Sequence, residues 1–135
     1  MNPHLSVVIC VYNEEKNVEP LVQQLEQHLS GYTHELVFVD DGSSDQTLAN
    51  LKKLARPNLH IVEFRRNFGQ SAALAAGIAQ ARGEWIVTMD GDLQNDPADI
   101  PRMLEMARER DLDMLAGIRQ KRQDGMLLRK VGAEG

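Results

Sequence analysis

The stretch Trp85-Ile-Val-Thr-Met-Asp90-Gly-Asp92-Leu-Gln94-Asn-Asp-Pro97 decides how the chain is expected to fold. It begins as an apolar run suited to a buried strand, and it ends in two carboxylates that stand one residue apart. Open α/β sheets keep their ligand sites at the carboxyl ends of the strands. The pattern therefore predicts a buried strand that delivers Asp90 and Asp92 to such an edge, followed by a helix that begins at Pro97.

The two carboxylates favour a site for a hard divalent cation. Asp90 and Asp92 alternate along an extended chain, so both can point the same way, and Gly91 lets a ligand approach the backbone closely. Two carboxylates that face one point repel each other unless a cation lies between them, and Mg²⁺ or Mn²⁺ suits an all-oxygen site that also has the amide of Gln94 nearby. The alternative is that both aspartates only cap the next helix, although Asp96 already provides a cap.

Length, charge and cysteine content exclude several classes of protein. The 135 residues suffice for one domain with a core, and the net charge of −5 argues against a general nucleic-acid binder. The single cysteine, Cys10, lies in an apolar run and has no internal partner, which predicts a reducing, cytoplasmic compartment. No apolar stretch approaches the roughly 20 residues that span a bilayer, and we expect no signal peptide.

Apolar runs and amphipathic segments alternate along the chain. The runs expected to form strands are 5–11, 35–40, 59–64, 85–90 and the short 113–117. The segments expected to form helices are 17–30, about 45–54, 70–81 and 97–110. This alternation predicts an α/β fold with three α/β/α layers, in which helices cover both faces of a mainly parallel sheet.

The carboxyl-terminal residues have a different composition from the rest. Residues 119–135 hold five basic and two acidic side chains. They show no pattern of a last strand or of core-forming residues. We expect a domain at 1–118, and a basic segment at 119–135 that leads toward a part outside this chain.

Polar side chains follow every predicted strand and should meet at one edge of the sheet. They are Tyr12, Asn13 and Glu14; Asp40 and Asp41; Arg65, Arg66 and Asn67; Asp90, Asp92 and Gln94; and Arg119. Simpler roles stay open for some of them: a turn and cap for Asp40 and Asp41, a first-turn helix charge for Glu14, and a solvated charge for Arg119. The four histidines show no ligand spacing and are expected at the surface or in loops.

Familiar motifs of other nucleotide-binding and hydrolytic proteins are missing from the sequence. The first strand is not followed by Gly-x-Gly-x-x-Gly, no phosphate-binding P-loop is present, and no serine lies in a nucleophile elbow. These absences argue against a nicotinamide or flavin fingerprint, a P-loop enzyme and a serine hydrolase.

Four motifs in order resemble family 2 glycosyltransferases of the GT-A fold. They are Val11-Tyr-Asn-Glu-Glu15; Asp40-Asp-Gly-Ser-Ser-Asp45-Gln-Thr47; Arg66-Asn-Phe-Gly-Gln70 with Ala72-Ala-Leu-x-Ala-Gly77; and Asp90-Gly-Asp-Leu-Gln94-Asn-x-Pro97. Within the family they look like the polyprenyl-phosphate sugar transferases, the branch of dolichol-phosphate mannose synthase and undecaprenyl-phosphate glycosyltransferases. The resemblance covers nearly the whole chain and implies a Rossmann-like nucleotide-sugar-binding fold.

The resemblance also implies roles for individual residues. Those assigned to the nucleotide sugar are Tyr12, Glu14, Asp40, Asp41, Asp90, Gln94 and Arg119. Those assigned to a Mg²⁺ or Mn²⁺ ion are Asp90, Asp92 and Gln94, with Asp92 as the anchor of metal and diphosphate. The chain departs from the family pattern at Cys10, where proline is usual, and at Gly91, where alanine is usual.

The implied reaction is an inverting transfer of a sugar from a nucleoside-diphosphate sugar to a polyprenyl (undecaprenyl or dolichyl) phosphate at the cytoplasmic face of the membrane. We expect this chain to be the donor-binding fragment, inactive alone. Other interpretations stay open: a non-catalytic nucleotide-sugar-binding module, a haloacid-dehalogenase-type phosphatase with Asp90 as nucleophile, or a receiver-like signalling domain. A receiver needs an acidic pair where Asn13 and Glu14 stand, and the phosphatase motif normally begins its fold.

Overall fold

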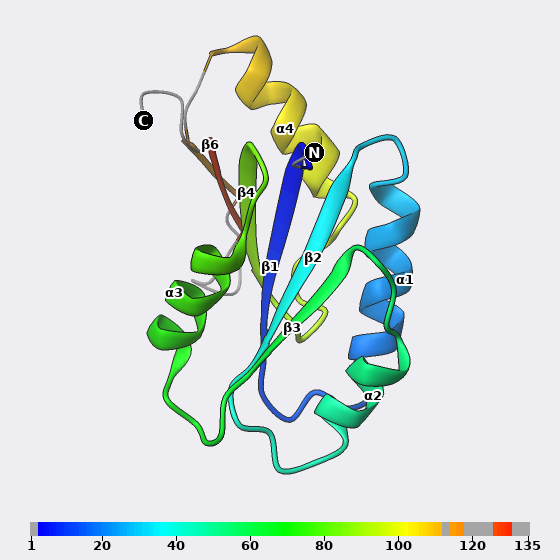
Figure 1. Cartoon of the computed structure of the whole chain (residues 1–135). Coiled ribbons are helices and arrows are strands. Elements are labelled where there is room, and N and C mark those ends of the chain that lie inside the picture. Colours follow the sequence, from blue (N-terminus) through cyan, green and yellow to red (C-terminus); the bar gives the residue numbers. More distant parts are fainter. Residues whose placement is uncertain (1–2, 112–113, 118–125, 131–135) are drawn as a thin grey trace.

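The computed structural model describes residues 3–111, 114–117 and 126–130 (Figure 1). In these residues the strands form one sheet of six, in the order β3-β2-β1-β4-β6-β5. The parallel strands are β1 (Leu5–Val11), β2 (His34–Asp40), β3 (Leu59–Glu63) and β4 (Trp85–Asp90). The strand β6 (Met126–Lys130) runs antiparallel to both β4 and β5 (Met114–Gly117). The predicted mainly parallel α/β sheet is confirmed.

Four helices cover the two faces of the described sheet. They are α1 (Val18–His28), α2 (Thr47–Lys53), α3 (Gln70–Gln80) and α4 (Asp99–Glu109). Helices α1, α2 and α4 contribute to the larger hydrophobic cluster, together with Leu5, Val7 and Ile9 of β1. Val8, whose side chain alternates with these, points to the opposite face, where α3 lies. The three-layer arrangement is therefore as predicted.

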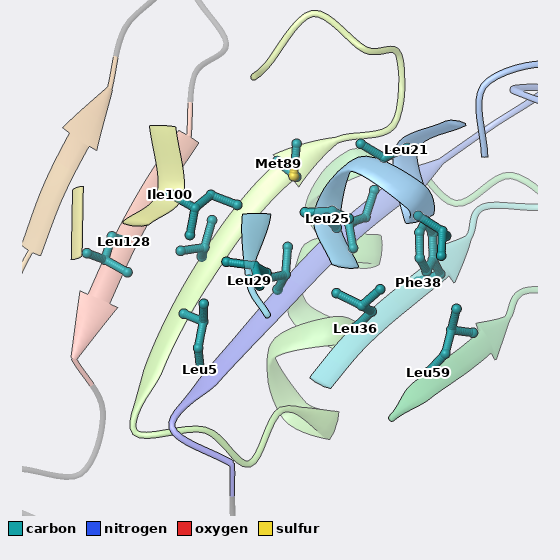
Figure 2. Packing of buried hydrophobic residues seen from close by; sticks show 14 of the residues in the cluster. Leu5, Leu21, Leu25, Leu29, Leu36, Phe38, Leu59, Met89, Ile100 and Leu128 are labelled. Atoms are coloured by element: carbon teal, nitrogen blue, oxygen red, sulfur yellow. The ribbon is translucent and has the colours of Figure 1, made fainter. Parts of the chain in front are cut away.

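The larger cluster forms the core between the sheet and helices α1, α2 and α4. Figure 2 shows Leu21 and Leu25 of α1 and Leu29, which directly follows α1, pointing at the strands, with Ile100 of α4 and Leu128 of β6 extending the core to one side. All five of these side chains are fully buried. On the opposite face α3 packs closely against the sheet, since a Cβ on Gly77 would lie 2.4 Å from Val8 Cγ1. The small side chains of α3 let it approach the sheet.

The expectation that the basic end contributes no strand and no core residue is wrong. Strand β6 pairs with β4 from Trp85 opposite Lys130 to Thr88 opposite Leu127, and Leu128 is buried in the main core. The strand is only five residues long and includes two basic side chains, so its apolar signal is short. The domain boundary at residue 118 stays a prediction.

Two smaller expectations also need correction. Helix α4 begins at Asp99 and not at Pro97, because a turn precedes it in which Asp96 Oδ1 accepts a hydrogen bond from the Ala98 N–H at 3.0 Å. His34 is not a surface residue: its side chain is 7% exposed, and its Nε2 lies 2.9 Å from Glu26 Oε1. None of the described helices is long and apolar enough to cross a membrane.

Candidate functional site

A cavity of about 190 Å³ opens where β1, β2 and β4 end. It is lined by Cys10, Val11, Tyr12, Glu14, Asp41, Gln70, Ala73, Asp90, Gly91 and Asp92. Five of the side chains assigned from the sequence therefore lie around one space. Asp40 and Gln94 do not line it, and Arg119 lies outside the described residues. The convergence follows from the parallel sheet, which brings the carboxyl ends of neighbouring strands to one edge.

The loop after β1 is tied to the loop after β2. Asn13, at φ 54°, accepts a hydrogen bond on Oδ1 from the Ser44 N–H at 2.8 Å, and its own N–H donates to Ser43 Oγ at 2.8 Å. The Glu14 N–H donates to Thr47 Oγ1 at 2.8 Å. These contacts give the polar residues of both loops a structural role. They also hold Tyr12, which is 47% exposed, at the mouth of the cavity.

Asp40 and Asp41 have different surroundings. Asp40 is 2% exposed, and its Oδ1 accepts from the Ser43 N–H at 3.3 Å, which is the geometry of a turn. Asp41 is 6% exposed and lines the cavity. Its contact with a nucleotide sugar stays a prediction, as does that of Asp40.

The Asp41 carboxylate fixes the loop between β3 and α3. It accepts hydrogen bonds from the N–H groups of Phe68 at 2.8 Å and Gly69 at 3.1 Å, and from Asn67 Nδ2 at 3.1 Å. The neighbouring Gly42 has a φ of +76°, and a Cβ there would lie 2.3 Å from a backbone carbon of the same loop. The start of α3 is thereby fixed against the end of β2.

The carboxylate pair lies on a closed turn. The Asp90 N–H donates to Oδ1 of Asn95 at 3.2 Å, and Asp92 Oδ1 accepts from the Gln94 N–H at 3.0 Å. Leu93, at φ 63°, packs against the main core and anchors the turn. The Gln94 side chain is exposed and outside the cavity lining, so its role as a ligand stays a prediction.

Two site residues had no role assigned from the sequence. Gln70 Nε2 donates to Asp90 Oδ1 at 2.9 Å, and Asn95, only 4% exposed, supports the backbone of the same aspartate. Gln70 belongs to one of the four motifs, but its contact is made across 20 residues of sequence. Gly91 also has a use that was not foreseen, since a Cβ there would lie 2.4 Å from Val11 Cγ1. A side chain at this position would require Val11, at the end of β1, to shift.

Negative charge concentrates at the cavity. Burial raises the pKa of the Cys10 thiol to about 12, and the nearby Asp90 and Asp41 add to the shift. Burial also raises the pKa of Glu14; a hydrogen bond from Asn17 opposes the shift, and Asp92 contributes to it. A site with this field favours a bound cation.

The residues present fit a divalent cation that a ligand would help to hold. Among the described residues, no group of three or more His, Cys, Asp or Glu side chains is arranged to bind a metal alone. Mg²⁺ in nucleotide sites is commonly held by one or two carboxylates together with substrate phosphates. Asp90 and Asp92 supply such a pair at the cavity wall, so the donor set suits a cation shared with a diphosphate.

Sequence comparisons connect the chain with proteins of known activity. The model of the family described as Glycosyl transferase family 2 matches residues 6–132. A dodecaprenyl-phosphate galacturonate synthase of Rhizobium johnstonii is 52% identical over 132 residues, which cover 94% of this chain and 39% of that protein. An undecaprenyl-phosphate 4-deoxy-4-formamido-L-arabinose transferase of Sodalis glossinidius is 41% identical over 134 residues, with coverages of 94% and 40%. The chain thus spans about 40% of the length of these relatives.

Solved structures share the fold. The mannosyltransferase PcManGT from Pyrobaculum calidifontis, in complex with GDP-Man and Mn²⁺, superposes with a TM-score of 0.80 at 20% identity over 96% of this chain and 45% of that one. At this identity the likeness shows the fold alone. The S. aureus TarS 1–349 structure in complex with UDP-GlcNAc has a TM-score of 0.67 at 26% identity over 84% of this chain and 33% of that one. The predicted GT-A fold is confirmed.

Proposed function

This chain belongs to glycosyl transferase family 2, and from that premise we propose that it is the donor-binding part of an inverting glycosyltransferase. The enzyme would move a sugar from a nucleoside-diphosphate sugar to a polyprenyl phosphate. The observation that carries the proposal is the cavity at the carboxyl edge of the sheet, with Asp90 and Asp92 in its wall. The printed names of the two relatives, both polyprenyl-phosphate sugar transferases, support the class of acceptor.

The side chains at the cavity have complementary tasks in this proposal. Asp90, Asp92 and Gln94 would hold a Mg²⁺ or Mn²⁺ ion. The ion would neutralise the charge that develops on the leaving diphosphate. Tyr12 and Glu14 would contact the nucleoside. Carboxylates accept hydrogen bonds from ribose hydroxyls or base N–H groups.

Asp41, which lines the cavity, is proposed to contact the nucleoside. Asp40, which accepts a hydrogen bond in the adjacent turn, is proposed to support Asp41. Asp41 already accepts hydrogen bonds on both carboxylate oxygens, so any contact with the ligand uses its remaining acceptor capacity. Arg119, outside the described residues, is proposed to contact the donor diphosphate or the acceptor phosphate.

The acceptor chemistry explains why a strong general base is not required. A phosphate monoester is ionised near neutral pH, so it is already a nucleophile when it arrives. We assign no catalytic base, and we place the reaction of the longer enzyme at the cytoplasmic face of a membrane, where a polyprenyl phosphate lies. Membership of the family replaces the phosphatase and receiver interpretations. A non-catalytic nucleotide-sugar-binding module would use the same donor site, and sugar transfer by this chain alone would contradict the proposed donor-binding role.

Calorimetric titration tests the donor site directly. UDP and then GDP are titrated into the protein with and without Mn²⁺. We expect one nucleotide to bind in a metal-dependent manner, and Asp92→Asn to weaken that binding by about 100-fold, since even indirect partners of a metal ligand change affinity 10- to 100-fold. Asp99→Asn is the matched control, because Asp99 lies on α4 outside the cavity lining. Failure of folded protein to bind either nucleotide would contradict the proposal.

A further inference from the structure

The side chain of Gln70 connects α3 with the carboxylate pair. It is the first residue of α3 and lines the cavity, and its Nε2 donates to Asp90 Oδ1 at 2.9 Å. The donor must be the amide nitrogen, because an ionised carboxylate only accepts hydrogen bonds. One neutral side chain from a different element thus contacts one of the two proposed metal ligands.

The position of Gln70 is fixed from both directions along the chain. On the amino side, Asp41 holds the N–H groups of Phe68 and Gly69, so the residue before the helix cannot shift freely. On the carboxyl side, the close packing of Gly77 against Val8 keeps α3 against the sheet. These contacts fix the start of α3, from which the exposed side chain of Gln70 reaches Asp90.

Asp90 is held at its backbone as well as at its carboxylate. Its N–H donates to the buried side chain of Asn95, and it is the last residue of β4. With the backbone fixed, the orientation of the carboxylate depends on the torsions of a short side chain, which a hydrogen bond to one oxygen restricts. A metal ligand whose orientation is set before the ion arrives loses less conformational freedom on binding.

We propose that Gln70 is a positioning residue whose amide holds the Asp90 carboxylate in the orientation that binds the divalent cation, and that it thereby sets the affinity for the cation. The inference rests on the proposed function, because it takes the cation to be shared with a nucleoside diphosphate. Hydrogen-bond partners of metal-ligating carboxylates typically change metal affinity 10- to 100-fold when they are removed.

The test measures Mn²⁺ affinity in the presence of a saturating concentration of whichever of UDP and GDP binds, with free Mn²⁺ followed by electron paramagnetic resonance. Gln70→Met keeps the length of the side chain and a good helix former but removes the amide donor. We expect its Mn²⁺ affinity to fall 10- to 100-fold, and Gln70→Ala to lose as much. Gln80→Met is the matched control on the last turn of the same helix, where affinity should stay unchanged.

The outcomes separate the two proposals. Urea unfolding midpoints of both Gln70 variants should stay close to that of wild type. If the role of Gln70 were merely structural, a weaker cation site would be accompanied by a lower unfolding midpoint. If wild type binds Mn²⁺ with nucleotide and both Gln70 variants bind equally well, or if Gln80→Met loses as much as they do, Gln70 does not position the ligand. If wild type shows no Mn²⁺-dependent binding, the proposed function fails and this inference fails with it.

Discussion

Acidic side chains lie both where the parallel strands begin, here called the amino edge of the sheet, and where these strands end, the carboxyl edge. The surroundings of the acidic side chains differ between the two edges. At the amino edge each of three glutamates has a histidine partner. The pairs are His34–Glu26, His60–Glu35 and His4–Glu84, with N–O distances of 2.9, 3.3 and 3.3 Å. At the carboxyl edge the cavity carboxylates accept hydrogen bonds from neutral amide groups, as in Gln70 to Asp90 and Asn17 to Glu14. The first arrangement joins elements of the fold, and the second keeps negative charge facing a cavity.

Cavity size alone would favour the amino edge. A cavity of about 550 Å³ lies at the amino edge, lined in part by His34, Glu35, His60 and Arg82. Its acidic group is already satisfied: Glu35 is 3% exposed, and its Oε2 accepts from the Ser6 hydroxyl at 2.6 Å and from the Arg82 N–H at 2.7 Å. The smaller cavity is the better candidate because several carboxylates line it, and burial, followed by the charges of Asp90 and Asp41, raises the pKa of Cys10 beside them.

Removing the buried carboxylate at the amino edge should have the largest effect on stability. Glu35→Ala leaves the Ser6 hydroxyl and the Arg82 N–H without their acceptor, and each unsatisfied group costs about 1–3 kcal/mol. We expect the free energy of unfolding in urea to fall by about 3 kcal/mol. Glu35→Gln keeps an acceptor and should lose only about 1 kcal/mol.

The same variants should leave the cavity at the other edge intact. Mn²⁺-dependent nucleotide binding by folded Glu35→Gln should equal that of wild type, because Glu35 does not line that cavity. Weaker binding in this variant, or an unfolding free energy of Glu35→Ala within the error of wild type, would remove the distinction between the two edges.

A change in the cavity wall should cost less. In Gly91→Ala the new methyl group would meet Val11 Cγ1 at 2.4 Å, and overpacking of this kind typically costs about 1–3 kcal/mol. We expect a loss of about 2 kcal/mol in urea unfolding. The cost of Gly91→Ala should fall by at least half in a Val11→Ala background, which frees the space. An equal cost in both backgrounds would show that Val11 is not what requires glycine at this position.

Much of the fold was predictable because apolar runs of strand length alternate with amphipathic segments. Strands β1 to β4 lie where these runs predict, and their polar ends converge because parallel strands share an edge. Strand β6 was missed because a five-residue segment that ends in Arg129 and Lys130 resembles a basic loop in sequence, although its Leu128 is fully buried.

The sequence predicts which strand ends carry the residues of the site, but it does not predict the contacts that their side chains make. Paired carboxylates at a strand end identify Asp90 and Asp92, but sequence spacing does not show that the first side chain of α3 reaches one of them. Nor does it show that Gln94 is absent from the cavity lining or that the His34 side chain is only 7% exposed. Such facts depend on how loops from different strands pack, and a single sequence does not contain them in any periodic form.

The smallest predicted effect has the opposite sign to that at Glu35. Burial raises the pKa of Glu14, with a further contribution from Asp92, so ionising this carboxyl costs more in the folded chain than in the unfolded chain. A folded pKa above the unfolded pKa means that stability is fully present below the ordinary glutamate pKa and is lost as pH rises through the folded value. Glu14→Gln, which keeps an oxygen acceptor for Asn17, should therefore be slightly more stable than wild type at pH 7.

The gain should be less than about 1 kcal/mol, because the side chain is only partly buried and solvent screens its neighbours. It should shrink as the pH is lowered below the ordinary glutamate pKa, where both chains carry a neutral group at this position. Urea unfolding of wild type and Glu14→Gln at both pH values measures the difference. A carboxylate whose removal stabilises the fold has a role other than stabilising the fold. A loss of Mn²⁺-dependent nucleotide binding in Glu14→Gln would show that this role is ligand binding. Destabilisation at pH 7 would instead place Glu14 with the structural carboxylates of the amino edge.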